Sequence, residues 1–424
     1  MANKSLFRSL MGKMLPKTDT VNHEGTPAYA LPPKHALAQL AATGCMNRTF
    51  YASAEEQRDR VLALCETIEP AFIARAAVFC RERGFMKDMP ALLCAVLSIK
   101  DRALFEKVFS RVVDNGKMLR TFVQIVRSGA VGRKSLGSLP KRMIRRWLAA
   151  RSDEEIVKAS VGQDPSLGDI LRMVHPKPEP GTREALYGWL LGRAPADKAL
   201  PDIVQRFEAF KAGRSKDVPN VPFQMLTALP LGTREWTDIA RHAPWQATRM
   251  NLNTFARHRV FETPGMDRLV AERLRDKAAL ARSRVFPYQL MAAYASAARE
   301  VPAVVRDALQ DAMQAAIANV PAIEGNVFVF PDVSGSMRSA ITGARKGATS
   351  AIRCVDVAAL VSAAILRKNP RAEVIPFEQD VVDVRLNPRD SVMTNAGALA
   401  GVHGDGRGGG RQRVTVVLGH HQRV

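Results

Sequence analysis

The sequence predicts a mainly α-helical protein, in which a long array of short helices precedes a smaller α/β segment. Apolar residues recur at helical spacing from Lys34 to Val320, and strand patterns are nearly absent there. Gly, Pro or Asx residues interrupt this pattern roughly every 12 to 20 residues. So many amphipathic helices cannot surround one compact core. We therefore expect stacked helix pairs of the HEAT type, arranged as a curved array or a closed ring.

Charge points to a polyanionic partner. The 424 residues contain 62 Lys and Arg against 41 Asp and Glu, a net charge of +21. Anionic membranes are the alternative partner, but no run of 18 apolar residues is present and the N-terminus lacks the features of a signal peptide. We expect a cytoplasmic protein that does not bind membranes, with residues 1–25 as a flexible basic arm.

The five cysteines predict neither a disulfide framework nor a zinc site. They occupy positions 45, 65, 80, 94 and 354 without a C-x-x-C pair, and no histidine is spaced as a fellow ligand. Cys65, Cys80 and Cys94 fall within apolar helical patterns. We expect them to be structural thiols.

A basic run from Asn115 to Ser152 is the strongest charge signal. It contains ten Lys or Arg residues and no acid. A loop rich in backbone donors and hydroxyls is followed by a helical segment, and this mixture suits phosphate binding. The candidate residues are Arg133, Lys134, Lys141, Arg142 and Arg145. A solvated helix face is the alternative. If six to eight of these cations neutralise phosphates, log K should fall against log salt with a slope of roughly 4 to 7.

Polar residues also interrupt the apolar face of a later segment, from Trp245 to His258. Gln246, Arg249, Asn251, Asn253 and Arg257 would line a cavity that holds single-stranded bases and phosphates. Trp245 or His258 would offer a stacking surface. Hydrogen bonds between neighbouring helical repeats explain the same residues equally well.

An apolar strand at 327–330 leads directly into a tight loop with Asp332, Ser334 and Ser336. Three converging oxygens suit a hard divalent cation such as Mg²⁺. Alternatively, these residues only stabilise the turn and cap the next helix. The phrase Asp-x-Ser-x-Ser after an apolar strand resembles the metal-ion-dependent adhesion site of von Willebrand factor A domains.

Several segments together resemble the Ro ribonucleoprotein autoantigen family over roughly residues 25 to 400. They are residues 132–142 (GRKSLGSLPKR), 175–178 (HPKP), 222–230, 245–258 and 332–336 (DVSGS). The resemblance implies a ring of HEAT-like repeats, the TROVE domain, joined to a von Willebrand factor A domain. It also implies that small Y RNAs bind an outer basic surface and that single-stranded RNA 3′ ends enter a central hole. By motif match, Lys134, Lys141, Arg142, His175 and Lys158 belong to the outer surface.

The expected domains are 1–25 (basic arm), 26–322 (TROVE), 323–400 (partial von Willebrand factor A-like) and 401–424 (atypical Gly/Arg-rich tail). In the third, we expect a helix at 355–368 and strands at 373–377 and 381–385. The family's second metal loop and its later aspartate are missing. Metal affinity should therefore be weak or absent, and the shortened domain prone to aggregation. We expect the tail to be out-of-frame or truncated sequence; a flexible RNA-binding segment is the alternative.

These observations predict an RNA-binding scaffold that is not an enzyme, because no G-x-S-x-G, P-loop or H-E-x-x-H motif is present. Members of the resembled family act in RNA quality control, and bacterial members are thought to tether an exoribonuclease. The alternative function is a metal-dependent protein-interaction module that binds an acidic partner through Asp332, Ser334 and Ser336.

Overall fold

The computed structural model describes residues 18–21, 27–44, 46, 53–341 and 352–402. It divides into two compact units, Met1–Ala209 and Phe210–Val424. Helices dominate both units, and within the described part of 34–320 there is no strand, as predicted. None of the described helices combines the length and apolar character needed to cross a bilayer.

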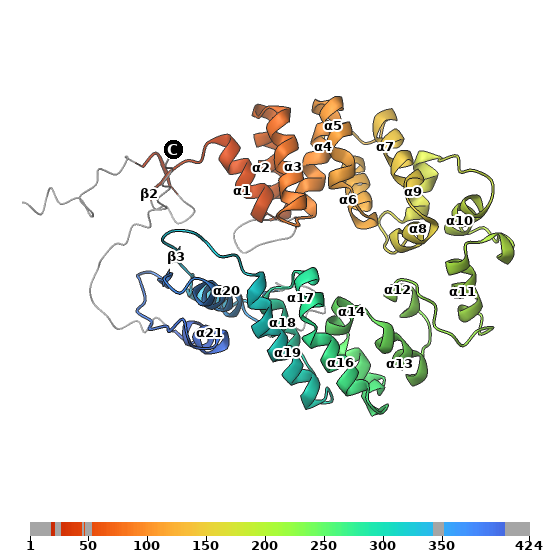
Figure 1. Cartoon of the computed structure of the whole chain (residues 1–424). Helices are drawn as coiled ribbons and strands as arrows, with labels where there is room; N and C mark the ends of the chain where they lie inside the picture. The colour runs from red at the N-terminus through yellow and green to blue at the C-terminus, as the bar shows by residue number, and fades with distance from the viewer. Residues whose placement is uncertain (1–17, 22–26, 45, 47–52, 342–351, 403–424) are drawn as a thin grey trace, which may run out of the picture. The chain divides into compact units, whose positions relative to one another are not determined.

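In the first unit, helices α1 to α7 lie side by side in chain order (Figure 1). The helices are α1 (Pro33–Thr43), α2 (Ala54–Thr67), α3 (Pro70–Glu82), α4 (Asp88–Lys100), α5 (Arg102–Val112), α6 (Gly116–Arg127), α7 (Ser138–Ala149), α8 (Asp153–Ala159), α9 (Leu167–Val174), α10 (Thr182–Leu190) and α11 (Asp202–Lys211), whose last residues pass into the second unit. Helix α3 packs against α4 and α5, and α7 packs against α9.

The core of the first unit is centred on α4, which is apolar on nearly all sides. Every residue from Met89 to Ser98 is buried, as expected for a helix enclosed by neighbours. Beside it, Phe105, Phe109 and Phe122 form a cluster with ring centroids 5.3–5.8 Å apart. The helical spacing of apolar residues therefore identified the buried faces correctly.

The second unit begins with short helices and ends with the α/β segment. Its elements are α12 (Phe223–Leu226), α13 (Thr233–His242), α14 (Trp245–Met250), α15 (Leu252–Arg257), α16 (Met266–Arg275), α17 (Lys277–Ser283), α18 (Pro287–Ala295), α19 (Ala303–Ala315), β3 (Phe328–Val329), α20 (Cys354–Lys368), β4 (Glu373–Val374) and α21 (Val392–Ala400). One apolar core runs from Trp245 to Leu399, so α20 and α21 share it with α16 to α19. The predicted boundary near residue 322 stays a prediction.

One prediction about strands is wrong. The strand expected at 381–385 is not formed; only an isolated bridge joins Phe377 to Val381. A strand needs a continuous ladder of N–H and C=O partners, and here a backbone bond from Val382 N to Pro376 O at 2.8 Å does not extend into one. Near the N-terminus, β1 (Thr20–Val21) pairs antiparallel with β2 (Pro27–Ala28). Most of residues 1–25 lie outside the described residues, and the flexible arm stays a prediction.

The strand leading to Asp332 is shorter and more exposed than expected. Only Phe328 and Val329 form β3, which pairs in parallel with β4, and half of the Phe328 side chain is exposed. The helix expected at 355–368 is confirmed as α20. Assignment of residues 323–400 to a von Willebrand factor A fold stays a prediction, and the tail 401–424 lies almost entirely outside the described residues.

Candidate functional site

A cleft of about 750 Å³ in the first unit gathers positive charge from three segments. Helix α7 contributes Arg145 and Arg146, the chain after α9 contributes His175 and Lys177, and α10 contributes Arg183. We call this the cationic cleft; Ala149, Pro176, Pro178, Glu179 and Tyr187 complete its lining.

The chain after α9 is held in place by short-range contacts. Arg145 Nε donates to the carbonyl oxygen of Val174, the last residue of α9, at 2.5 Å. His175 ends the helix in the left-handed conformation, with φ 46°, and remains exposed. Because Pro176 and Pro178 restrict the following backbone, His175 and Lys177 are presented by a stiff segment.

The guanidinium of Arg183, which also lines the cleft, is occupied by hydrogen bonds within the protein. It bonds Asp153 Oδ1 at 2.5 Å and donates to the carbonyl oxygens of Leu148 and Arg151. Among the lining residues, Arg145, Arg146 and Lys177 then face a single carboxylate, that of Glu179. This excess of positive charge suits an anion, and charge-assisted hydrogen bonds to phosphate are strong.

The sequence predicted part of this cleft. Arg145 and His175 were candidates, and the structure brings them together although 30 positions separate them. Arg146 lies in the basic run and Lys177 in the 175–178 motif, but neither was among the predicted site residues. Arg183 and Tyr187 carried no signal in the sequence that would have selected them.

The other predicted cations of the first unit do not line the cationic cleft. Arg133 Nη1 donates to Leu136 O at 3.3 Å within its loop, while Lys134 is exposed. Lys141 lies half-buried near the start of α7, and exposed Lys158 lies 4.0 Å from Glu154.

The basic run from Asn115 to Ser152 contains no acid, but in the folded protein an acid from another helix lies beside it. In space, Glu106 of α5 pairs with Arg142 at 2.5 Å and lies 3.5 Å from Arg146. The run therefore has an acidic partner at α7, supplied by an earlier helix, and part of its positive charge is offset there.

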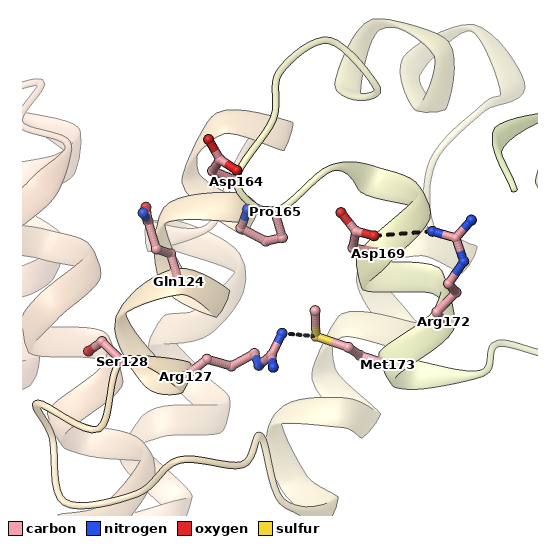
Figure 2. A pocket seen from close by; sticks show the side chains of 8 residues that line it. All are labelled: Gln124, Arg127, Ser128, Asp164, Pro165, Asp169, Arg172 and Met173. Carbon is pink, nitrogen blue, oxygen red and sulfur yellow. Dashed lines mark hydrogen bonds and ion pairs between the residues drawn. The ribbon is translucent and has the colours of Figure 1, made fainter.

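A second cleft of about 590 Å³ lies between α6 and α9 and is shown in Figure 2. Arg127 reaches Met173, with 3.6 Å between Nη1 and Sδ, and Arg172 pairs with Asp169 at 3.1 Å. A hydrogen bond from the Ser166 hydroxyl is the main cause that lowers the pKa of Asp169. Gln124, Ser128, Asp164 and Pro165 complete the lining. Its two Arg and two Asp residues balance, so this cleft suits an anion less well.

In the second unit, the predicted polar residues hold the helices together. Arg249 donates to Gln289 O at 3.0 Å, and burial lowers the pKa of its guanidinium. Asn253 Nδ2 donates to Ser296 O at 2.7 Å, and its Oδ1 accepts from Ala298 N at 2.9 Å. The alternative interpretation, hydrogen bonding between helices, therefore describes these two side chains.

Asn251 and Arg257 differ from that pair. Asn251 Nδ2 donates locally, to Ala247 O at 2.8 Å. Arg257 is exposed and lines a cleft of about 720 Å³ with Asn253, Glu262 and Glu300. Contact of any of these residues with a nucleic acid stays a prediction.

The prediction that Trp245 offers a stacking surface for bases is wrong. Its indole is buried, and Nε1 donates to Leu274 O at 3.2 Å. His258 stacks on Trp236, with centroids 4.5 Å apart and planes at 16°, so one face of its ring is occupied. Helix packing in this unit uses the aromatic surface that we had assigned to bases.

The predicted metal residues meet in one turn. Ser334 Oγ lies 3.1 Å from Ser336 Oγ, and Asp332 Oδ1 accepts from Ser334 N at 2.9 Å. One carboxylate and two adjacent hydroxyls are hard oxygen donors, which fit a hard cation. Across the residues that the structure describes, no cluster of three or more His, Cys, Asp or Glu side chains is suited to a metal.

Comparison with known proteins identifies the fold. No protein-family model matches the chain. Its sequence is similar to that of the RNA-binding protein RO60 of Deinococcus radiodurans, with 26% identity over 443 aligned residues that cover 92% of this chain and 80% of that protein. Its structure is similar to the crystal structure of the Deinococcus radiodurans RO (RSR) protein, with a TM-score of 0.65 and 19% identity over 87% of this chain and 80% of that one. Similarity along nearly the whole sequence, together with the shared fold, supports the predicted resemblance to the Ro ribonucleoprotein family.

Proposed function

We propose that this chain is an RNA-binding protein of the Ro type and that its cationic cleft takes RNA phosphates. The observation that carries the proposal is the convergence of Arg145, Arg146, His175 and Lys177 from separate segments around one cleft. The name of the Deinococcus relative, an RNA-binding protein, supports the same ligand.

The finer roles rest on the family resemblance. Small Y-like RNA would extend from the cationic cleft over an outer basic surface that includes Arg133, Lys134, Lys141, Arg142 and Lys158. Single-stranded 3′ ends would be held elsewhere, with Arg249, Asn251, Asn253 and Arg257 as candidate contacts. The protein would act in the cytoplasm as a non-catalytic scaffold in RNA quality control, with an exoribonuclease as its partner.

Neutralising the cationic cleft tests the main proposal. The double variant Arg146→Gln/Lys177→Gln should weaken binding of a structured RNA at least about fivefold, because charge-assisted hydrogen bonds to phosphate are lost. The slope of log K against log salt should become shallower by roughly 1.4 to 1.8. Fluorescence anisotropy over a salt series measures both quantities.

The matched control is Arg234→Gln/Lys277→Gln, which removes the same charge from exposed positions of the second unit. Equal losses in the two double variants would show that net charge alone matters, and would refute a site at the cleft.

For the turn at Asp332, we propose a weak divalent-cation site, with Mg²⁺ as the expected ion. The hydroxyls of Ser334 and Ser336 and the carboxylate of Asp332 would hold the cation, which would then offer open positions to an acidic group of a partner protein. Their position in one turn supports this second candidate function, a metal-dependent protein-interaction module.

Calorimetric titration with Mg²⁺ tests the cation site. We expect a dissociation constant on the order of a millimolar or weaker, since few ligands converge, and no binding by Asp332→Asn. Asp390→Asn, at an exposed position, is the control. Binding that persists in Asp332→Asn would place the cation elsewhere.

A further inference from the structure

One face of α3 carries aromatic and cationic side chains in alternation. Phe72, Arg75, Phe79 and Arg83 follow one another at spacings of three or four residues and so share a face. The opposite side of α3 packs against α4 and α5. Phe79 is 61% exposed, and both arginines are exposed. Phe79 therefore contributes little to the core, whereas Phe72 is half-buried and has Lys34 Nζ 5.8 Å from its ring centroid.

A second exposed aromatic side chain follows the helix. Phe85 is 49% exposed and has a φ of 54°, a left-handed conformation that glycine usually adopts at a helix end. The backbone is fixed on either side of it: Gly84 N donates to Phe79 O at 3.2 Å, and Met86 N donates to Cys80 O at 2.9 Å. Phe85 is therefore presented from a fixed position. We call Phe72, Arg75, Phe79, Arg83 and Phe85 the α3 stripe.

Acids close to the α3 stripe are neutralised by other cations. Glu82 forms two bonds of 2.7 Å with Arg111, and Glu69 pairs with Lys34 at 2.7 Å. Within the described residues, Arg83 forms no ion pair with an acid. The stripe therefore keeps a positive potential beside its exposed rings.

We propose that the α3 stripe binds unpaired nucleotides of RNA, with bases stacked on Phe79 and Phe85 and phosphates at Arg75 and Arg83. Every base has a face that stacks on an aromatic ring, so such contacts tolerate any sequence. Bases in a duplex are already stacked on one another, so the surface selects single strands. The inference rests on the proposed RNA-binding function and adds to it a site outside the cationic cleft.

The spacing along α3 fits this ligand. Arg75 lies about one turn before Phe79 along the helix and Arg83 about one turn after it. The phosphates on either side of a base stacked on Phe79 would therefore each meet a guanidinium. A lipid surface would require a continuous apolar patch, whereas here guanidinium groups interrupt the rings.

Phe79→Ala tests the proposal, with a fluorescent unstructured oligouridine and a blunt RNA duplex as probes. We expect roughly 5- to 30-fold weaker binding of the oligouridine and unchanged binding of the duplex, because one stacking contact is lost. Phe79→Trp should preserve the affinity. Since the side chain is largely exposed, Phe79→Ala should melt at the same temperature as the parent protein. Phe286→Ala, which removes a ring 42% exposed in the second unit, is the matched control.

The outcomes separate this inference from the proposed function. If Phe79→Ala binds oligouridine as the parent does while Arg146→Gln/Lys177→Gln loses duplex affinity, the stripe is refuted and the RNA-binding function stands. If the parent protein binds neither probe, the RNA-binding function itself fails. If Phe79→Ala loses binding to phosphatidylglycerol vesicles but not to oligouridine, the stripe is a lipid surface and the inference is overturned.

Discussion

At the scale of single residues, the cysteines illustrate how burial controls reactivity. Burial raises the pKa of the Cys65 thiol to about 12 and raises the pKa values of Cys80 and Cys94 in the same direction. Cys354 is only partly buried. Because the thiolate is the reactive species, a raised pKa and an enclosed sulfur both slow alkylation.

We therefore expect iodoacetamide at mildly alkaline pH to modify Cys354 well before the other three described thiols. Mass spectrometry of peptides from the native protein measures the order of modification. Labelling in urea, where all four thiols should react together, is the control. Labelling of Cys94 at the rate of Cys354 in the native protein would contradict the buried assignment.

Other properties of single residues lie beyond what the sequence predicts. The helical pattern predicted that Cys65, Cys80 and Cys94 are structural. It did not predict that Gly116 approaches Ala159 so closely that an added Cβ would lie 2.6 Å from the Ala159 Cα. Such an approach depends on how α6 packs against α8, and local residue order does not encode it.

At the scale of elements, short helices depend on their caps. Helix α9 spans only eight residues and begins with a capping box: Asp169 N donates to Ser166 Oγ at 3.1 Å, and Ser166 N donates to Asp169 Oδ2 at 3.0 Å. The same helix ends at His175 in the cationic cleft. A disturbed start of α9 should therefore affect the geometry of the cleft.

Ser166→Ala should lower the free energy of unfolding of the first unit by about 1 kcal/mol, the usual cost of a lost N-cap. The Ser166 hydroxyl lowers the pKa of Asp169. The stability from this lowered pKa is present above the unfolded-state pKa and is lost as pH falls through the folded-state value. The difference between parent and variant should therefore shrink in acid. Urea melts at neutral and acidic pH measure it; a constant difference would contradict the linkage.

The sequence predicted helices better than strands because the two depend on different partners. An amphipathic helix satisfies its hydrogen bonds internally, so the periodicity of residues such as Phe105 and Phe109 was sufficient. A strand at 381–385 requires a continuous ladder of partners, and its composition cannot show that the ladder is absent. Trp245 was misassigned for a similar reason, since an aromatic side chain in the sequence carries no sign of the helix that will cover it.

At the scale of the whole molecule, a net charge of +21 governs how RNA is attracted. We expect log K for RNA to fall against log salt with a slope of roughly 4 to 7, because each neutralised phosphate releases counterions. Titrations at several salt concentrations measure the slope. A slope near zero would contradict phosphate binding as the main source of affinity.

The continuous apolar core of the second unit also limits how the chain can be divided. Helix α20 packs against α18, and its buried Leu360 and Ala363 belong to the same core as Leu309 and Ile317. A protein shortened after Val320 would expose this apolar surface to water and would be prone to aggregation. Crystallisation of the helical array should therefore use the chain through α21, because α20 and α21 cover the apolar core of the second unit.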